Sequence, residues 1–248
     1  MSEQTDGGSQ IQGQQEPAGE VKGGFFASLV DIFIDPIKVF RRIDGGLAWW
    51  KAYIVVSIIT IILGWLNMPM QRRAMELGAE NMSEEQVQAM LENMERFGWM
   101  GLIIAPIGIL VIYLIIAGIT HLVINIISMS SNFKKTLSLI SFCGLIGMVE
   151  QIIKHVIIRF RGIESIQSMS DLKVSFGLAA LFPELEGFWF AFLESLSIFQ
   201  IWYLVLLLFG IATIFKIDLK KSAIPVLVNW LISLLVLYVS SLFGGGMG

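Results

Sequence analysis

Charged residues are missing from three long stretches of this chain. Residues 97–133, 195–215 and 222–248 contain no Lys, Arg, Asp or Glu over 37, 21 and 27 positions. A helix of about 20 mainly apolar residues crosses the roughly 30 Å hydrocarbon core of a bilayer, because it bonds its backbone polar groups internally. Such runs exclude an ordinary water-soluble domain. They predict an all-α integral membrane protein.

Cysteine is nearly absent, and the usual catalytic patterns are missing. The single cysteine, Cys143, cannot form an intrachain disulfide, and no Cys/His pattern has metal-ligand spacing. The sequence lacks a His-Glu-x-x-His zinc helix, and its predicted spans lack the aspartates that a paired-carboxylate mechanism needs. We therefore expect a non-catalytic protein that uses neither a cofactor nor a bound metal.

The chain is also poor in charge overall. Charged residues make up 15% of it and hydrophobic residues 55%, and its mean hydropathy is +0.74. Soluble domains carry roughly 25% charged residues. The net charge is −3, and no basic segment is interleaved with aromatic residues, so nucleic acid is not an expected partner. The expected surroundings are the lipid bilayer.

Both ends of the chain differ from its middle. Residues 1–24 are rich in Gly, Gln, Ser and Glu and have few aliphatic side chains. Such a segment cannot bury enough apolar surface to offset the entropy lost on ordering, so we expect a disordered tail. At the other end, residues 244–248 form a Gly-rich tail.

An amphipathic pattern occupies residues 25–45. Apolar side chains recur at three- and four-residue steps opposite a charged face, and Pro36 interrupts the pattern. Because this face is too short to span, we expect an interfacial helix in the headgroup plane. The alternative is a helix packed on its own protein. The apolar face comprises Phe26, Leu29, Val30, Phe33, Ile37 and Phe40, and the charged face Asp31, Asp35, Lys38 and Arg42.

Five transmembrane helices are predicted within residues 46–243. The expected spans are 49–68, 102–127, 136–153, 188–215 and 224–243. An external connection at about 70–97 separates the first two spans. Within it, Ser83-Glu84-Glu85-Gln86 has the spacing of a capping box and predicts a short acidic helix over 83–97.

The positions of the basic residues predict an orientation. Two short loops between spans hold Lys134, Lys135, Lys216, Lys220 and Lys221. Short loops rich in Lys and Arg face the cytoplasm, so we expect a cytoplasmic N-terminus and an external C-terminus. Three basic residues at the end of the third span argue against this orientation: Lys154, Arg159 and Arg161.

Ionisable side chains inside the predicted spans are candidates for function. Glu150 and Lys154 lie one helical turn apart near the outer end of the third span. Glu194 lies at a similar depth in the fourth span, and His121 lies inside the second. These groups either line a path for a proton or an ion, or make structural ion pairs and hydrogen bonds. Two asparagines are predicted to make interhelical contacts: Asn125 and Asn229.

Four short segments occur in one order along this five-span plan. They are Asp35-Pro36-Ile37-Lys38-Val39-Phe40, Ser83-Glu84-Glu85-Gln86, Phe199-Gln200-Ile201-Trp202 followed by Gly210, and Lys221-Ser222-Ala223 followed by Trp230-Leu231. Together they resemble the prokaryotic branch of the Yip1 family over about residues 25–243. The resemblance implies a five-helix bundle with a cytoplasmic N-terminus, in the cytoplasmic (inner) membrane if the source is prokaryotic. The family-motif positions include Asp35, Pro36, Phe40, Trp202 and Lys221.

The resemblance also bears on partners. Eukaryotic Yip1 relatives act in vesicle traffic and bind small Rab-type GTPases and one another, but their Asp-Leu-Tyr-Gly-Pro segment does not occur in this sequence. GTPase binding is therefore not expected, whereas self-association or binding to other membrane proteins is. We expect a scaffold or accessory subunit for other membrane proteins. The alternative is a small permease or ion channel that uses His121, Glu150 and Glu194, and an intramembrane enzyme is the least favoured class.

Overall fold

The computed structural model describes residues 24–79, 82–128, 131–167, 169–182 and 184–244. The predicted tails 1–24 and 244–248 lie outside these residues, apart from Gly24 and Gly244. The described residues form α-helices and short 3-10 helices (η) and no strand. The helices are α1 Phe25–Ile34, α2 Pro36–Asp44, α3 Trp49–Gly78, α4 Glu84–Ser128, α5 Phe133–Arg161, η1 Ile163–Ser165, η2 Met169–Leu172, η3 Leu178–Leu181, α6 Gly187–Glu194, α7 Ile198–Phe215 and α8 Leu219–Gly244.

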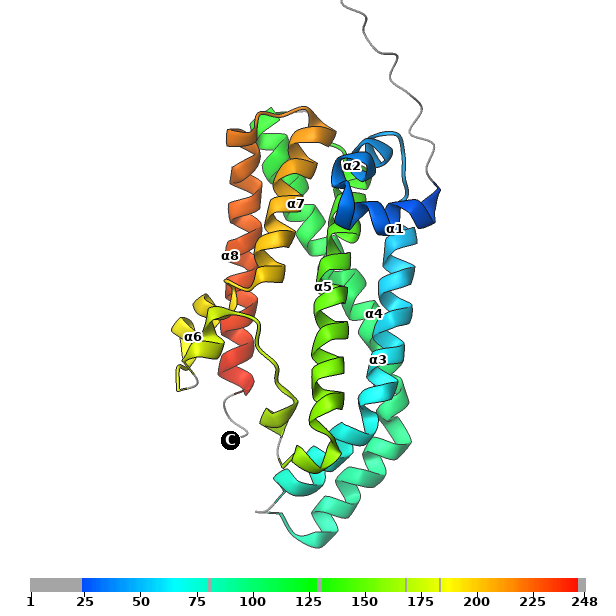
Figure 1. The fold of residues 1–248 in the computed structure, drawn as a ribbon, viewed down its shortest axis with the longest axis vertical. Coiled ribbons are helices and arrows are strands. Elements are labelled where there is room, and N and C mark those ends of the chain that lie inside the picture. The colour runs from blue at the N-terminus through cyan, green and yellow to red at the C-terminus, as the bar shows by residue number, and fades with distance from the viewer. Residues whose placement is uncertain (1–23, 80–81, 129–130, 168, 183, 245–248) are drawn as a thin grey trace, which may run out of the picture.

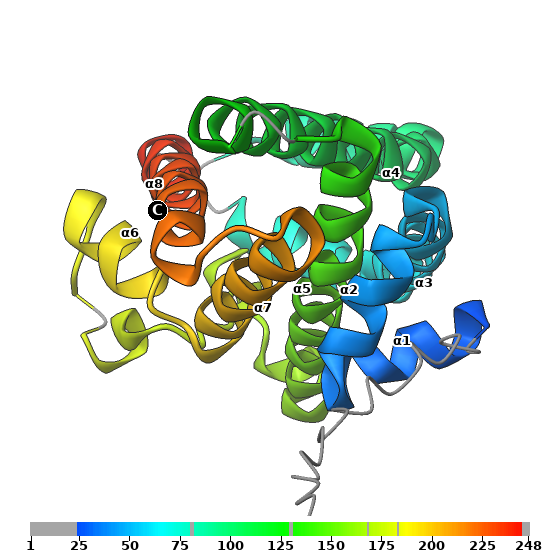
Figure 2. The same cartoon turned by 90° about the horizontal axis from the view of Figure 1, so that it is seen from above.

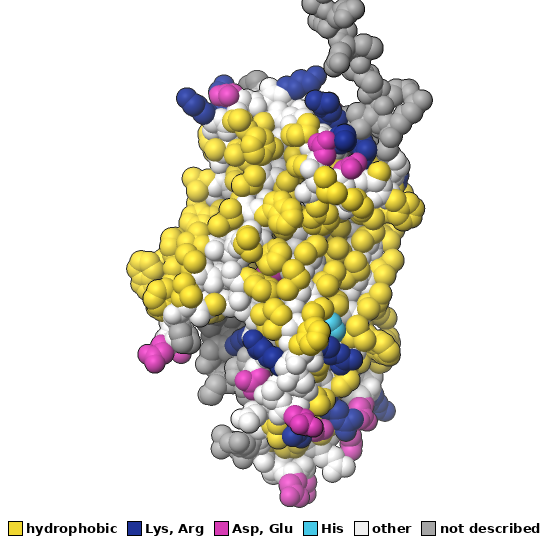
Figure 3. All heavy atoms as spheres, in the orientation of Figure 1, with side chains coloured by type: hydrophobic (Ala, Val, Ile, Leu, Met, Phe, Trp, Pro, Cys, Tyr) yellow, Lys and Arg dark blue, Asp and Glu magenta, His cyan; other side chains and the backbone are white. Residues whose placement is uncertain are grey.

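Five of these helices are long and apolar enough to cross a membrane: α3, α4, α5, α7 and α8. The predicted all-α, five-span architecture is therefore confirmed. Successive spans run in opposite directions along the long axis of the bundle (Figure 1). A broad band of hydrophobic side chains covers the middle of the molecule, and charged side chains gather toward its two ends (Figure 3). This distribution suits a middle zone surrounded by lipid tails.

The helix α5 forms the centre of the bundle. It packs against α3, α4 and α7 and also against α2, as the view along the bundle shows (Figure 2). Every residue from Thr136 to Cys143 is at most 4% exposed. A helix that is buried all round must meet protein on every face. Serines and glycines along α5 allow its neighbours to approach closely.

The helix α4 is longer than the sequence predicts. The capping box is present, because Ser83 Oγ accepts from the Gln86 backbone N–H at 3.3 Å and Gln86 Oε1 accepts from the Ser83 N–H at 3.0 Å. However, no break separates the predicted helix 83–97 from the second span, and α4 continues for 45 residues. The extension packs along α3, where Arg72 forms an ion pair with Glu95 at 2.5 Å.

The predicted fourth span, 188–215, is two helices. The chain turns between α6 and α7, and only α7 is long and apolar enough to span. Ser197 ends the run, because its Oγ accepts the Gln200 backbone N–H at 3.1 Å and caps α7. Ser195 Oγ donates to the Phe192 carbonyl at 2.7 Å at the end of α6. The short helix α6 packs against α8 instead of extending α7.

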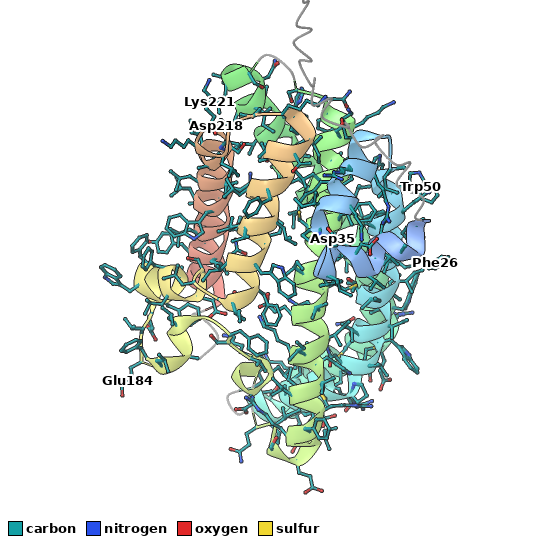
Figure 4. The ribbon with its side chains drawn as sticks, turned by 45° about the horizontal axis from the view of Figure 1, so that its top comes forward. Phe26, Asp35, Trp50, Glu184, Asp218 and Lys221 are labelled. Atoms are coloured by element: carbon teal, nitrogen blue, oxygen red, sulfur yellow. The ribbon has the colours of Figure 1, made fainter. Side chains whose placement is uncertain are left out.

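The amphipathic segment 25–45 forms two helices that are seated on the bundle. Pro36 begins α2, and the chain bends at Asp35. Phe40 is fully buried against α5 and α7, which corresponds to the alternative of packing on the protein itself. Phe26 and Ile34 of α1 are each 77% exposed and keep an apolar face toward the surroundings. Figure 4 shows Phe26 and Trp50 on this outer side.

Candidate functional site

A cavity of about 640 Å³ lies inside the bundle. All five spanning helices contribute to its wall, together with Leu172 of η2. Its volume falls within the range of roughly 300–1,000 Å³ that is typical of small-molecule sites, and such sites combine apolar walls with a few polar groups. The cavity is therefore the candidate functional site of the described residues.

Two polar pairs line one part of the cavity. Glu150 and Lys154 form the predicted ion pair, with 2.7 Å between Oε1 and Nζ and side chains that are 18% and 22% exposed. Next to it, the ring Nδ1 of His155 lies 2.6 Å from Oδ1 of Asn67. His155 is 7% exposed, so this bond joins α5 to α3 away from the surface. An ion pair and a histidine–amide pair thus face the same space.

A third polar group of the cavity lacks a partner. The side-chain Nε2 of Gln200, at the start of α7, is buried and makes no hydrogen bond among the described residues. Tyr113 and Tyr203 also line the cavity. A buried amide donor without a bond costs free energy, because the water that it bonds in the unfolded chain is not replaced.

Two glycines of α5 give the cavity its shape. A Cβ atom at Gly144 would lie 2.0 Å from the Tyr113 hydroxyl, so the ring of Tyr113 occupies the space of a side chain. A Cβ atom at Gly147 would meet nothing within 4 Å. Gly147 therefore leaves open a volume that almost any other residue would fill.

The other two predicted intramembrane groups lie elsewhere. Glu194 ends α6 and accepts a hydrogen bond from Ser175 Oγ. His121 contacts the Ser131 hydroxyl through Nδ1, and its ring meets Phe133 edge-on at 5.8 Å between centroids. Neither residue lines the cavity. His121, Glu150 and Glu194 thus do not form one site.

The motif around Pro36 lies where α1 and α2 pack against the bundle. Asp35 and Lys38 form an exposed ion pair at 3.0 Å, and the hydrogen bond from Lys38 lowers the pKa of the Asp35 carboxyl below its ordinary value of 3.8. Leu139 and Phe40 fill the space left by Gly210 of α7, where a Cβ atom would lie 2.3 Å from a Leu139 methyl carbon and 3.2 Å from the Phe40 ring. Phe40 thus packs α2 against α7.

Trp202 and Arg42 make further contacts with the N-terminal helices. The ring of Trp202 meets Phe33 edge-on, with 5.8 Å between centroids. Arg42, predicted on the charged face, is 9% exposed at its side chain and forms an ion pair with Asp31 of α1 at 2.6 Å. Its guanidinium also donates to Ser28 Oγ at 3.1 Å. Arg42 and Asp31 therefore join α1 to α2, whereas Asp35 and Lys38 remain exposed.

The remaining predicted polar positions have separate roles. Lys221 is exposed in the first turn of α8, close to Asp218 (Figure 4). Asn229 Nδ2 donates to Thr120 Oγ1 at 2.8 Å and joins α8 to α4, so its predicted interhelical contact is confirmed. Asn125 is exposed on α4, and the prediction of an interhelical contact there is wrong.

The Yip1 domain family matches residues 30–241, which are 212 of the 248 residues. The chain belongs to the Yip1 family. Comparison with curated proteins and with solved structures gave no match. The Yip1 domain includes the second half of α1, all of α2 and the five spans. The helix α2 and the cavity are thus parts of the family's domain.

Three cavity residues of this Yip1 domain were not predicted as site residues from the sequence: Asn67, His155 and Gln200. His155 adjoins Lys154 in an otherwise apolar run, which was a local signal. Gln200 lies three residues after Ser197 and so completes the pattern of an N-cap. Asn67 gives no such signal, because its role depends on a contact with a residue 88 positions away.

Proposed function

We propose that this Yip1 protein is a non-catalytic scaffold or accessory subunit that binds other membrane proteins or a second copy of itself. The observation that carries this proposal is the length of α4. Its 45 residues measure about 68 Å at 1.5 Å per residue, more than twice the roughly 30 Å hydrocarbon core. The surplus forms a helical projection with the end of α3 at one end of the molecule (Figure 1).

The projection is suited to contact a partner because it is rigidly attached and charged. A small apolar cluster at its base contains Met70 and Ala74 of α3 together with Ile158 and Ile166. Along the projection, acidic side chains such as Glu85 and Glu92 are exposed. They lie seven residues apart on the same face of α4. This face complements a basic segment of a partner.

The basic residues at the opposite end of the bundle predict its orientation in the membrane. The turns before α5 and α8 lie at the same end of the bundle as α1 and α2 (Figure 1). We place this end in the cytoplasm, because short Lys-rich loops stay there. If the source is prokaryotic, the chain then resides in the cytoplasmic membrane, with the projection outside.

Cysteine labelling in intact cells tests this orientation. The native Cys143 is fully buried, so it gives little background. An impermeant maleimide should label Gln88→Cys on the projection and leave Lys220→Cys unlabelled until the cells are opened. Labelling of Lys220→Cys alone in intact cells would reverse the orientation.

Co-purification tests the scaffold itself. The full chain is isolated from its native membrane, and stoichiometric partners, including further copies of itself, are quantified. The double variant Glu85→Lys/Glu92→Lys should lose its partner. The matched control Glu184→Lys, an exposed charge reversal on another segment, should retain it. Loss of the partner in both variants, or no stoichiometric assembly of the unmodified chain, would contradict the proposal.

The cavity favours a second candidate, a small permease. Glu150 and Lys154 are ionisable groups between the spans, and such groups mark ion or proton paths in many transporters. Proton flux into proteoliposomes with a pH-sensitive dye tests this function. A permease requires a flux that Glu150→Gln abolishes and that His121→Asn preserves, since His121 lies outside the cavity. Absence of any flux leaves the scaffold as the only function supported.

A further inference from the structure

The lining of the cavity indicates a bound molecule, and this indication does not depend on the scaffold role. Gln200 holds a buried donor without an acceptor at the wall of an open volume. Natural proteins rarely leave such groups unpaired, and an unpaired group calls for a specific explanation. A bound molecule with an oxygen acceptor supplies the missing bond.

On both α3 and α5, most of the apolar residues that line the cavity precede the polar ones along the chain. On α5, Ile140 and Gly147 precede Glu150 and Lys154. On α3, the apolar residues that begin at Val56 precede Asn67. Because α3 and α5 run in the same direction (Figure 1), the polar groups of both helices gather toward the same end of the cavity, which the apolar residue Ile158 closes one turn further along α5. The occupant is thus amphipathic, with a polar head at this end and an apolar chain beyond it.

The charges at the polar end select the kind of head group. Glu150 and Lys154 neutralise each other, so the pair presents both signs side by side at 2.7 Å. An anionic head near Lys154 would also lie near the Glu150 carboxylate, which repels it. A head group with a phosphate and an ammonium ion matches both charges at once, since each of its charges meets the opposite one.

We infer that the cavity binds a zwitterionic phospholipid of the phosphatidylethanolamine type. Its phosphate and ester oxygens accept from Lys154 and Gln200, and its ammonium group binds Glu150. One acyl chain lies along the apolar walls that α3 and α4 supply, where Val56 and Ile109 line the cavity. The volume of about 640 Å³ suits one chain and a head group. The second chain remains in the bilayer.

Photocrosslinking to the full chain in nanodiscs tests the inference. The host bilayer is phosphatidylglycerol, which is anionic. It contains a small fraction of phosphatidylethanolamine with a diazirine near the end of one acyl chain. A second preparation contains the same diazirine chain on phosphatidylglycerol. Labelled positions are then mapped by mass spectrometry of the peptides.

Two residues of α4 report the two kinds of lipid contact. Ile109 lines the cavity, whereas Ile107 is 55% exposed on the outside of the bundle. The phosphatidylethanolamine probe should label Ile109 as well as Ile107. The phosphatidylglycerol probe should label Ile107 and label Ile109 at least about tenfold less, a difference of about 1.4 kcal/mol in binding. Equal labelling of Ile109 by both probes would overturn the selectivity and with it the proposed head group.

A cavity-filling variant provides the matched control. Gly147→Leu places a side chain in the open volume without a steric clash, since a Cβ atom there meets nothing within 4 Å. Gly108→Leu makes the same change on an exposed face of α4, where a Cβ atom likewise meets nothing. Labelling of Ile109 should disappear in Gly147→Leu and persist in Gly108→Leu. Labelling confined to Ile107 in every variant would show surface lipid alone and overturn the inference.

A second variant keeps the test decisive if Gly147→Leu folds poorly. Gln200→Leu removes the unpaired donor, so the lipid-free chain should melt at an equal or higher temperature, while labelling of Ile109 falls. An unchanged level of labelling would remove Gln200 from the site and contradict the proposed head-group contact. Partner co-purification is unaffected in either case, so this result and that of the scaffold test are distinguishable.

Discussion

The helices α4 and α5 are both membrane spans, yet they differ in almost every other respect. The apolar part of α4 has a mean hydropathy of 2.9, and 11% of its residues are buried within the protein. The corresponding values for α5 are 1.7 and 56%. The less apolar span is therefore the one inside the bundle.

This difference follows from what each helix touches. Lipid tails contact α4, so its exposed positions carry large aliphatic side chains such as Ile103 and Ile107. Protein surrounds α5, where Ser138, Ser141 and Gly144 allow close packing and local hydrogen bonding. Without a hydrophobic force between helices in lipid, packing decides which span is central. Hydropathy finds the spans, and small or polar residues identify the inner one.

The strongest test of this comparison truncates one large side chain on each helix. Phe142 of α5 is fully buried, whereas Ile107 of α4 faces outward. Phe142→Ala should destabilise the fold by about 3–5 kcal/mol, because it opens a cavity. Ile107→Ala should change stability by no more than about 0.5 kcal/mol, as for other surface positions. Unfolding in detergent micelles measures both values, and similar costs would remove the distinction between the two helices.

A smaller effect is expected from adding volume. Gly210→Val drives a methyl group toward Leu139 and Phe40, since the Cβ atom alone would lie 2.3 Å from a Leu139 methyl carbon. The expected cost is about 1–3 kcal/mol. It should be accompanied by faster proteolysis of α1 and α2, because Phe40 is displaced. Gly108→Val on the outside of α4 serves as the control and should leave both readouts unchanged.

The hydrogen bond between α4 and α8 should contribute less. A double-mutant cycle with Asn229→Leu and Thr120→Val isolates the bond of 2.8 Å between their side chains. Bonds of this kind average about 0.6 kcal/mol in bilayers and reach at most about 1.7 kcal/mol. A coupling energy near zero would assign Asn229 to its other bond, to the Pro225 carbonyl at 2.9 Å.

The smallest effect concerns the exposed Asp35 at the bend before α2. Because its pKa is lowered in the folded chain, its ionised form contributes stability above pH 3.8, and this contribution is lost as the pH falls through the lower folded value. Asp35→Asn should therefore be slightly less stable than the unmodified chain at neutral pH, with a gap that closes in acid. A gap that widens in acid would contradict the sign.

Much of the fold could be predicted from composition along the chain. Long apolar stretches predict five spans, and the capping box at Ser83 predicts where α4 begins. The break between α6 and α7 was missed, although Ser197-Ile198-Phe199-Gln200 has the spacing of an N-cap. Ser197 is flanked by apolar residues within a run without charge, so the segment was predicted to be one continuous span.

The site could be predicted only in part. The pair of Glu150 and Lys154 is local, four residues apart on one helix, so its spacing is visible in the sequence. The cavity depends on five helices meeting, and Asn67 and His155 become neighbours only through tertiary packing. No local pattern encodes the space beside Gly147. Such a space is a property of the assembled bundle.

Labelling of the unmodified chain from the lipid phase tests the central distinction most directly. A small apolar diazirine reagent dissolved in the bilayer reacts with whatever side chains the lipid contacts. We predict strong labelling of α4 at Ile103 and Ile107 and almost none over Thr136 to Cys143 of α5, where each residue is at most 4% exposed. Comparable labelling per residue in the two segments would contradict the account, because α5 would then face lipid.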